Sequence, residues 1–115
     1  MFLKIDIEGG EYQIIDDILR FSDRITSLVI EFHEAHDRKR FCNSIKQLQT
    51  CFHIVHIHGN NCAPRSPDGL PDVLEITFLP IDSVSLGLRR TTLPLADLDS
   101  PNHDGWPDYP LTFQT

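Results

Sequence analysis

The sequence predicts an α/β fold, and three observations support this class. Short apolar runs typical of buried strands recur at residues 2–7, 25–33, 51–58 and 73–79. Helical apolar patterns separate the first, second and third of these runs. The connections are long enough for right-handed crossovers between parallel strands. We therefore expect about three parallel strands plus one antiparallel strand, with flanking helices.

The first strand and first helix are expected at the start of the chain. Residues 2–7 have the apolar density of a central strand, and Gly9-Gly10 end it. The helix expected over residues 10–20 carries its apolar side chains on one face, namely Ile14, Ile15, Ile18 and Leu19. Glu11 is expected in the first turn, largely outside that face, where a carboxylate suits the positive end of the helix dipole.

The remaining elements follow from similar patterns. In residues 25–33 the run Leu28-Val29-Ile30 is continuously apolar, as expected when helices cover both faces of a sheet. Asp37 is a plausible N-cap for a second helix. Its core positions recur at i, i+4 and i+7, namely Phe41, Ile45 and Leu48. Residues 73–79 alternate apolar and polar side chains, which fits an antiparallel or edge strand.

The chain is expected to divide into a partial α/β domain at residues 1–96 and an extended C-terminal tail at 97–115. Residues 59–72 contain two glycines and three prolines and are predicted to be a loop. A short turn or helix is possible within 81–96, at Val84, Leu86 and Leu88. The tail is expected to lie over the surface, held by Trp106 and Tyr109.

Composition excludes several classes of partner. The 115 residues include 10 Lys and Arg against 17 Asp and Glu, a formal net charge of −7. An acidic chain has little attraction for nucleic acid or anionic membranes. No apolar stretch of transmembrane length and no signal peptide is visible. The three cysteines lack zinc-site spacing, so we expect a reducing cytoplasm, with Cys42 and Cys51 as core fillers and Cys62 exposed.

Acidic side chains and one imidazole cluster at two predicted strand ends. Asp6 and Glu8 are expected to project the same way from the first strand, and Glu31 and His33 alternate at the end of the second. Ligands of open α/β sheets bind beyond the carboxyl ends of the strands. The four side chains can form a general-base pair or a divalent-metal site. Alternatively, Asp6 caps a turn, Glu8 is solvated and His33 is structural; we expect no metal.

The third strand and the following loop supply further polar candidates. His56 and His58 are expected on one face of the strand, with His53 on the other. Asn60 and Asn61 can hydrogen-bond a substrate, or can simply form the turn that asparagine favours.

Four stretches of the chain stand in a distinctive order: Lys4-Ile5-Asp6-Ile7-Glu8-Gly9-Gly10-Glu11, Val29-Ile30-Glu31-Phe32-His33, His56-Ile57-His58-Gly59-Asn60-Asn61-Cys62, and Leu70-Pro71-Asp72-Val73-Leu74-Glu75-Ile76-Thr77. Together they resemble the FkbM-type methyltransferases, which are S-adenosylmethionine-dependent O-methyltransferases. In that family the first stretch typically has residue types in this order: lysine, apolar, aspartate, apolar, glutamate, glycine, small, glutamate. The stretch Leu98-Asp99-Ser100-Pro101-Asn102, followed by Asp108-Tyr109-Pro110-Leu111, is similar to the close of some members.

The resemblance covers the C-terminal half of such an enzyme. It implies a partial Rossmann-like methyltransferase sheet containing the fourth to seventh strands of the complete fold. The first three strands, which hold the glycine-rich turn and the ribose-binding acid, have no counterpart here. The cofactor implied is S-adenosylmethionine, and we do not expect this chain to bind it without a cofactor-binding half. The resemblance assigns catalytic roles to Asp6, Glu8 and His33, and substrate binding to Glu31, His58, Asn60 and Asn61.

The first strand would be internal in a complete sheet. Its outer edge here is expected to be covered by a second copy in a homodimer, by the chain's own tail or by a missing N-terminal half. Two other functions remain open from the sequence. One is a non-catalytic remnant that binds a small ligand or assembles with itself, and the other is a metal-dependent, hydrolase-like site.

Overall fold

The computed structural model describes residues 1–83, 92–93, 99, 102–103 and 105–112. Its centre is a four-stranded sheet in the order β1-β2-β4-β3. The strands are β1 (Phe2–Ile5), β2 (Ser27–Phe32), β3 (Phe52–Gly59) and β4 (Leu74–Pro80). Two α-helices, α1 (Ile15–Arg20) and α2 (Arg38–Leu48), accompany it. The α/β class is confirmed.

The sheet is mixed in strand direction. β1 and β2 pair in parallel, whereas β4 pairs antiparallel with β2 on one side and with β3 on the other. The strands β1, β2 and β3 therefore point the same way, but hydrogen bonds join only β1 and β2 in parallel. β1 lies at one edge of the sheet, as the sequence predicts.

The first strand is shorter than expected and the first helix is divided. β1 ends at Ile5 because the backbone turns over the next residues, where the Gly10 amide donates to the Ile7 carbonyl. Glu8 and Gly9 both adopt positive φ in this turn. A 3-10 helix at Gly10–Gln13 precedes α1, in place of one helix over residues 10–20.

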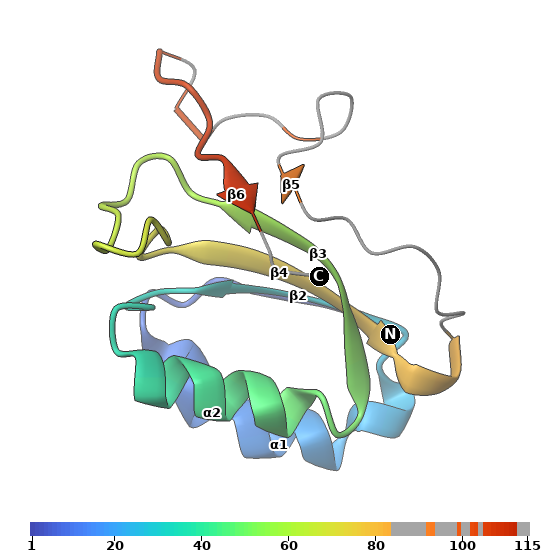
Figure 1. The fold of residues 1–115 in the computed structure, drawn as a ribbon. Coiled ribbons are helices and arrows are strands. Elements are labelled where there is room, and N and C mark those ends of the chain that lie inside the picture. The colour runs from blue at the N-terminus through green and yellow to red at the C-terminus, as the bar shows by residue number, and fades with distance from the viewer. Residues whose placement is uncertain (84–91, 94–98, 100–101, 104, 113–115) are drawn as a thin grey trace.

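Both α-helices lie against the same face of the sheet (Figure 1). The core between them is formed by alternate residues of the strands and by the apolar faces of the helices, including Ile30, Phe78, Ile18, Phe41 and Leu48. Among the described residues no helix covers the other face, contrary to the expectation of helices on both faces. Val29 is only partly buried because its side of β2 faces away from the helical layer, whereas Leu28 and Ile30 are fully buried.

Helix α2 forms as its sequence predicts. The Asp37 carboxylate accepts a hydrogen bond from the Arg40 amide at 3.3 Å, which confirms the N-cap. Phe41 and Leu48 are buried and Ile45 packs beside them. Cys42 lies on the exposed side of α2, so its expected role as a core filler is wrong.

A β-bulge in β3 changes which histidines share a face. The register with β4 shifts between Ile54 and His56, which leaves Val55 unpaired and exposed. His53, His56 and His58 then stand opposite Leu79, Thr77 and Glu75, three alternate residues of β4. All three histidines therefore lie on the face away from the helices, contrary to the expectation that His53 lies on the other side.

The described parts of the C-terminal segment lie over that same face (Figure 1). The short strands β5 (Thr92–Leu93) and β6 (Leu111–Thr112) pair antiparallel, and Leu111 joins the buried core. Tyr109 holds the segment, because its hydroxyl donates to the Ala63 carbonyl at 2.5 Å. The Trp106 ring instead stacks on His103 and remains half exposed. The turn or helix expected at Val84, Leu86 and Leu88 falls outside the described residues.

No helix in the described part of the chain has both the length and the apolar character needed to cross a membrane.

Candidate functional site

Asp6, Glu31 and His33 come together at the carboxyl ends of β1 and β2. One ligand atom from each lies within 4.8 Å of the others. His33 Nε2 is 3.8 Å from Asp6 Oδ1, and the Asp6 side chain is half exposed. These two strands are parallel neighbours, so their ends meet at the same edge of the sheet. The cluster predicted from the strand ends is therefore formed by these three side chains.

Glu31 is the anchored carboxylate of this cluster. Its Oε1 accepts a hydrogen bond from Asn60 Nδ2 at 3.0 Å, and its other neighbour is Asp6. Partial burial, followed by a hydrogen bond with Asp6, raises the pKa of Glu31 above its usual value. Two carboxyl groups this close hold a proton between them more readily than either would alone.

Glu11 is the residue that sequence reasoning missed. Its side chain is fully buried rather than outside the apolar face. Oε2 accepts from the Gly9 amide at 2.9 Å, and Oε1 accepts from the His33 amide at 2.5 Å. Oε1 also lies 3.3 Å from His33 Nδ1. The only sequence signal for this role is the glutamate that closes the motif beginning at Lys4.

Tyr12 and Arg40 form a further set of contacts next to the His33 backbone. The Tyr12 hydroxyl donates to the His33 carbonyl at 2.5 Å. The Arg40 guanidinium lies 4.1 Å from the centre of the Tyr12 ring and pairs with Glu34 at 2.5 Å. Burial, together with the neighbouring Glu11 carboxylate, raises the pKa of the Tyr12 hydroxyl well above its usual value. Tyr12 is therefore a stable hydrogen-bond donor.

Glu8 stands apart from the cluster. It is exposed and has φ 50°, a left-handed conformation that is uncommon outside glycine. The alternation that would place Glu8 beside Asp6 ends with β1 at Ile5. Among the described residues, the group of close metal-ligating side chains contains Asp6, Glu31 and His33 but not Glu8.

His58 and Asn61, which the sequence suggested as substrate-binding residues, contact the C-terminal segment. His58 is buried and pairs with Asp108 at 2.9 Å. Asn61 is 1% exposed; its Nδ2 lies within 3.1–3.3 Å of three backbone carbonyls, and its Oδ1 accepts from the His103 amide. These polar groups are occupied by the protein itself, so in this conformation neither side chain is available to a substrate.

Asn60 does reach the cluster. Its Nδ2 donates to Glu31, as described above, while its Oδ1 accepts from the Cys62 amide at 2.9 Å and holds the turn. Asn60 therefore forms the turn that the sequence suggested, and its expected hydrogen bond to a substrate stays a prediction. Asn60 orients Glu31.

Glu75 and Lys4 form a neighbouring ion pair on the sheet. Their side chains are 3.8 Å apart and both are substantially exposed. Glu75 stands opposite Glu31 on β2 and opposite His58 on β3, so it continues the polar row across the sheet. Lys4 is therefore salt-bridged in this structure.

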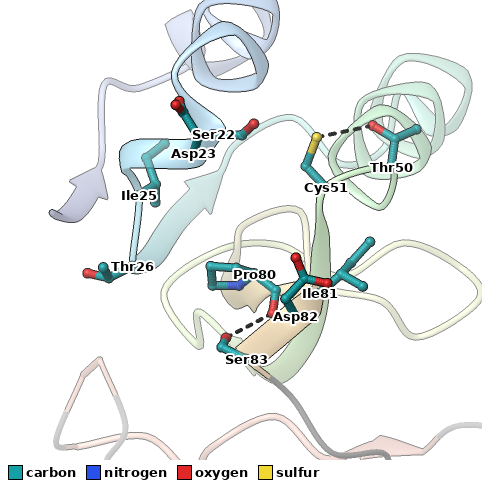
Figure 2. A pocket seen from close by; sticks show the side chains of 10 residues that line it. All are labelled: Ser22, Asp23, Ile25, Thr26, Thr50, Cys51, Pro80, Ile81, Asp82 and Ser83. Carbon is teal, nitrogen blue, oxygen red and sulfur yellow. Dashed lines mark hydrogen bonds between the residues drawn. The ribbon is translucent and has the colours of Figure 1, made fainter.

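An open pocket of about 660 Å³ lies at the other end of the sheet (Figure 2). Its lining comes from the segments that precede β2 and β3 and from the end of β4, and includes Ile25, Thr50, Cys51 and Pro80. These are the amino ends of β2 and β3, opposite to the Asp6 cluster. Ligands of open α/β sheets normally bind at the carboxyl ends of the strands, so we do not assign the candidate site to this pocket.

Comparison with known families identifies the chain. The family model described as the methyltransferase FkbM domain matches residues 1–76, a stretch that includes Asp6, Glu11, Glu31, His33 and Asn60. Comparisons with curated proteins and with solved structures give no match. The matched stretch runs from β1 into the start of β4 and covers more than half of the sequence. The chain therefore belongs to the FkbM methyltransferase domain family.

Proposed function

We propose that this domain is the acceptor side of an S-adenosylmethionine-dependent O-methyltransferase, and that a substrate hydroxyl binds between Asp6, Glu31 and His33. The observation that carries the proposal is the convergence of these three side chains, within 4.8 Å, at the carboxyl ends of two parallel strands. Family membership supplies the reaction class. The acceptor is a hydroxyl of a sugar, a lipid or a small metabolite.

The side chains at the cluster suit a hydroxyl acceptor. Asp6 is half exposed and can accept a hydrogen bond from an incoming hydroxyl. Glu31 and its Asn60 partner fix the opposite side of the cluster. His33 supplies a ring nitrogen that can take the hydroxyl proton, which makes the oxygen a better nucleophile. An oxygen prepared in this way can accept a methyl group.

This chain offers contacts for only one part of the methyl donor. S-adenosylmethionine, when bound, supplies an electrophilic methyl group, and the exposed Asp6 and Glu8 carboxylates suit its ammonium group. The sequence has no Gly-x-Gly turn of the kind that holds the cofactor in the complete fold. We therefore propose that the domain corresponds to the C-terminal half of that fold and is inactive alone.

The free edge of β1 is the proposed position of the missing elements. Within the described part of the chain β1 has one neighbour in the sheet, and its Phe2 side chain is 62% exposed. Exposed strand edges with apolar flanks tend to pair with another chain. We propose that this edge is covered by a second copy of the chain or by a cofactor-binding half. Size-exclusion chromatography with light scattering should give a dimer of the isolated chain. Two results together would rule the proposal out. The isolated chain would be a monomer, and its β1 amides would exchange rapidly both alone and after a cofactor-binding half is added.

Cofactor binding is tested by calorimetry. Titration of the chain with S-adenosylmethionine should give no binding heat, because the glycine-rich turn is absent. Micromolar binding would overturn the proposed dependence on a second half and would favour an enzyme that is complete in itself.

Acceptor binding is tested with methyl glucoside as a hydroxyl probe, monitored by NMR. We expect millimolar binding with shifts at the Asp6, Glu31 and His33 signals. The D6N variant should bind several-fold more weakly, whereas E8Q, which removes a nearby charge outside the cluster, should bind as the wild type does. Equal losses for D6N and E8Q, or shifts confined to residues outside the cluster, would refute this site for sugar hydroxyls.

A further inference from the structure

The most unusual side chain in the molecule is the Glu11 carboxylate. It is completely buried, yet it has three donors within reach: the amides of Gly9 and His33, and Nδ1 of His33. A buried carboxylate without such partners would be strongly destabilising. The two backbone amides account for part of this arrangement, and the contact with the His33 ring calls for a further explanation.

We propose that Glu11 is a positioning residue that holds the His33 ring in the tautomer with hydrogen on Nδ1, so that Nε2 faces the acceptor hydroxyl as a proton acceptor. The proposal rests on the function proposed above and gives the roles of two residues within it. Glu11 itself is too deeply buried to touch a substrate.

The tautomer follows from hydrogen-bond chemistry. A carboxylate can only accept, so the ring nitrogen that faces Glu11 Oε1 at 3.3 Å must carry the hydrogen. In a neutral imidazole the other nitrogen then has a free lone pair. That nitrogen, Nε2, points to the half-exposed Asp6, with 3.8 Å between it and Oδ1. This separation is too long for a direct hydrogen bond, and a hydroxyl can approach both atoms.

The backbone of His33 is held at the same time. Glu11 accepts from the His33 amide and Tyr12 donates to the His33 carbonyl. The 3-10 turn after β1 therefore fixes both the main chain and the ring of a residue at the end of β2. The titratable groups around the ring are Asp6 and Glu31 on the open side and Glu11 on the buried side, with Tyr12 at the backbone.

The proton balance of the step is simple. The O–H bond of the acceptor breaks and its proton forms an N–H bond at Nε2, which leaves an imidazolium beside two carboxyl groups. The oxygen keeps the electron pair and forms its new bond to the methyl carbon of a sulfonium donor. The carbon–sulfur bond breaks and the donor leaves as a neutral thioether.

The test is an NMR measurement of the ring nitrogens of His33, which needs neither cofactor nor substrate. Long-range nitrogen–proton correlation spectra of the wild-type chain at a pH where the ring is neutral should show hydrogen on Nδ1. In the E11Q variant the Nδ1–H form should lose its dominance, because a glutamine oxygen is a weaker acceptor and its amide group competes for the same donors. The E34Q variant, which removes a nearby carboxylate that pairs with Arg40 instead, should keep the wild-type tautomer.

Each result is decisive. Hydrogen on Nε2 in the wild type, or an unchanged tautomer in folded E11Q, would overturn the proposal. Should E11Q fail to fold, the wild-type spectrum alone still tests the assignment. If the tautomer is as expected but a chain supplied with its cofactor-binding half transfers no methyl group, the positioning role stands and the proposed function fails. Where transfer occurs, E11Q should lower kcat by about 10²-fold with little change in KM, as for loss of a general base.

Discussion

His58 and Asp108 lie side by side with 2.9 Å between Nε2 and Oδ2, although 50 positions separate them in the chain. Each side chain is 11% exposed, so the pair is largely shielded from water. It is one of several contacts that fasten the C-terminal segment to the face of the sheet opposite the helices. The pair therefore has a structural role that the strand pattern alone could not reveal.

Replacing Asp108 by leucine should destabilise the fold, because His58 then keeps its burial but loses its partner. We expect the free energy of unfolding to fall by about 1–3 kcal/mol. Urea denaturation followed by circular dichroism measures it. The same substitution at Asp82, an exposed carboxylate at the other end of the sheet, serves as the control. Equal effects of D108L and D82L would show that the His58 contact contributes nothing.

The neighbouring asparagines should respond differently to alanine. N61A removes a buried amide whose oxygen and nitrogen both contact the C-terminal segment, so we expect a loss of about 1–3 kcal/mol. In N60A, water can replace the hydrogen bonds to Glu31 and to the Cys62 amide, so we expect the free energy of unfolding to fall by less than about 1 kcal/mol. N60A should instead weaken methyl glucoside binding, because Glu31 loses its support. Thermal unfolding and NMR titration of both variants separate the two roles, and the reverse pattern would contradict them.

The helical layer and the strands could be predicted because their signals are local. The spacing of Phe41, Ile45 and Leu48 and the cap at Asp37 fix α2 without reference to the rest of the chain. The convergence of Asp6, Glu31 and His33 also followed from strand ends, because parallel neighbours bring their carboxyl ends to one edge.

Three features could not be predicted from local patterns. The bulge at Val55 inserts one residue into β3 and reverses the alternation, which moves His53 to the face of His56 and His58. The burial of Glu11 depends on donors from the end of another strand. The occupation of Asn61 depends on residues more than 40 positions away. Each depends on contacts between residues far apart in the sequence, and propensity and periodicity describe only neighbouring residues.

Glu31 should make stability depend on pH in a defined direction. Its pKa is raised above the ordinary value of 4.5, chiefly by burial and then by the Asp6 hydrogen bond. A proton on Glu31 therefore favours the folded state. This contribution is fully present below pH 4.5 and is lost as the pH rises through the higher folded value.

The E31Q variant removes this titration and retains an oxygen for Asn60. Its stability relative to the wild type should therefore be greater at pH 7 than at pH 4, as measured by urea unfolding at both values. D82N reports the general effect of removing one negative charge from a chain of net charge −7. A pH-independent difference between E31Q and the wild type, or one no larger than that of D82N, would contradict the proton held between Glu31 and Asp6.

Tyr12 should produce a loss of stability at alkaline pH. Burial, with a further contribution from the Glu11 carboxylate, raises its pKa above the ordinary value of 10.0. The folded state therefore keeps the phenol proton to a higher pH than the unfolded state does. The stability that this difference provides is fully present below pH 10 and declines as the pH rises above it.

Because the chain has two tyrosines, the comparison is made in a Y109F background, where Tyr12 is the single phenol. At pH 8 the Y12F substitution should cost about 1 kcal/mol through loss of the hydrogen bond to the His33 carbonyl. The difference between Y109F and Y12F/Y109F should shrink from pH 10 upward in urea unfolding experiments, because only the chain that retains Tyr12 gains an ionisable phenol in its unfolded state. A difference that stays constant up to pH 11 would mean that Tyr12 is not held as a protonated donor beneath His33.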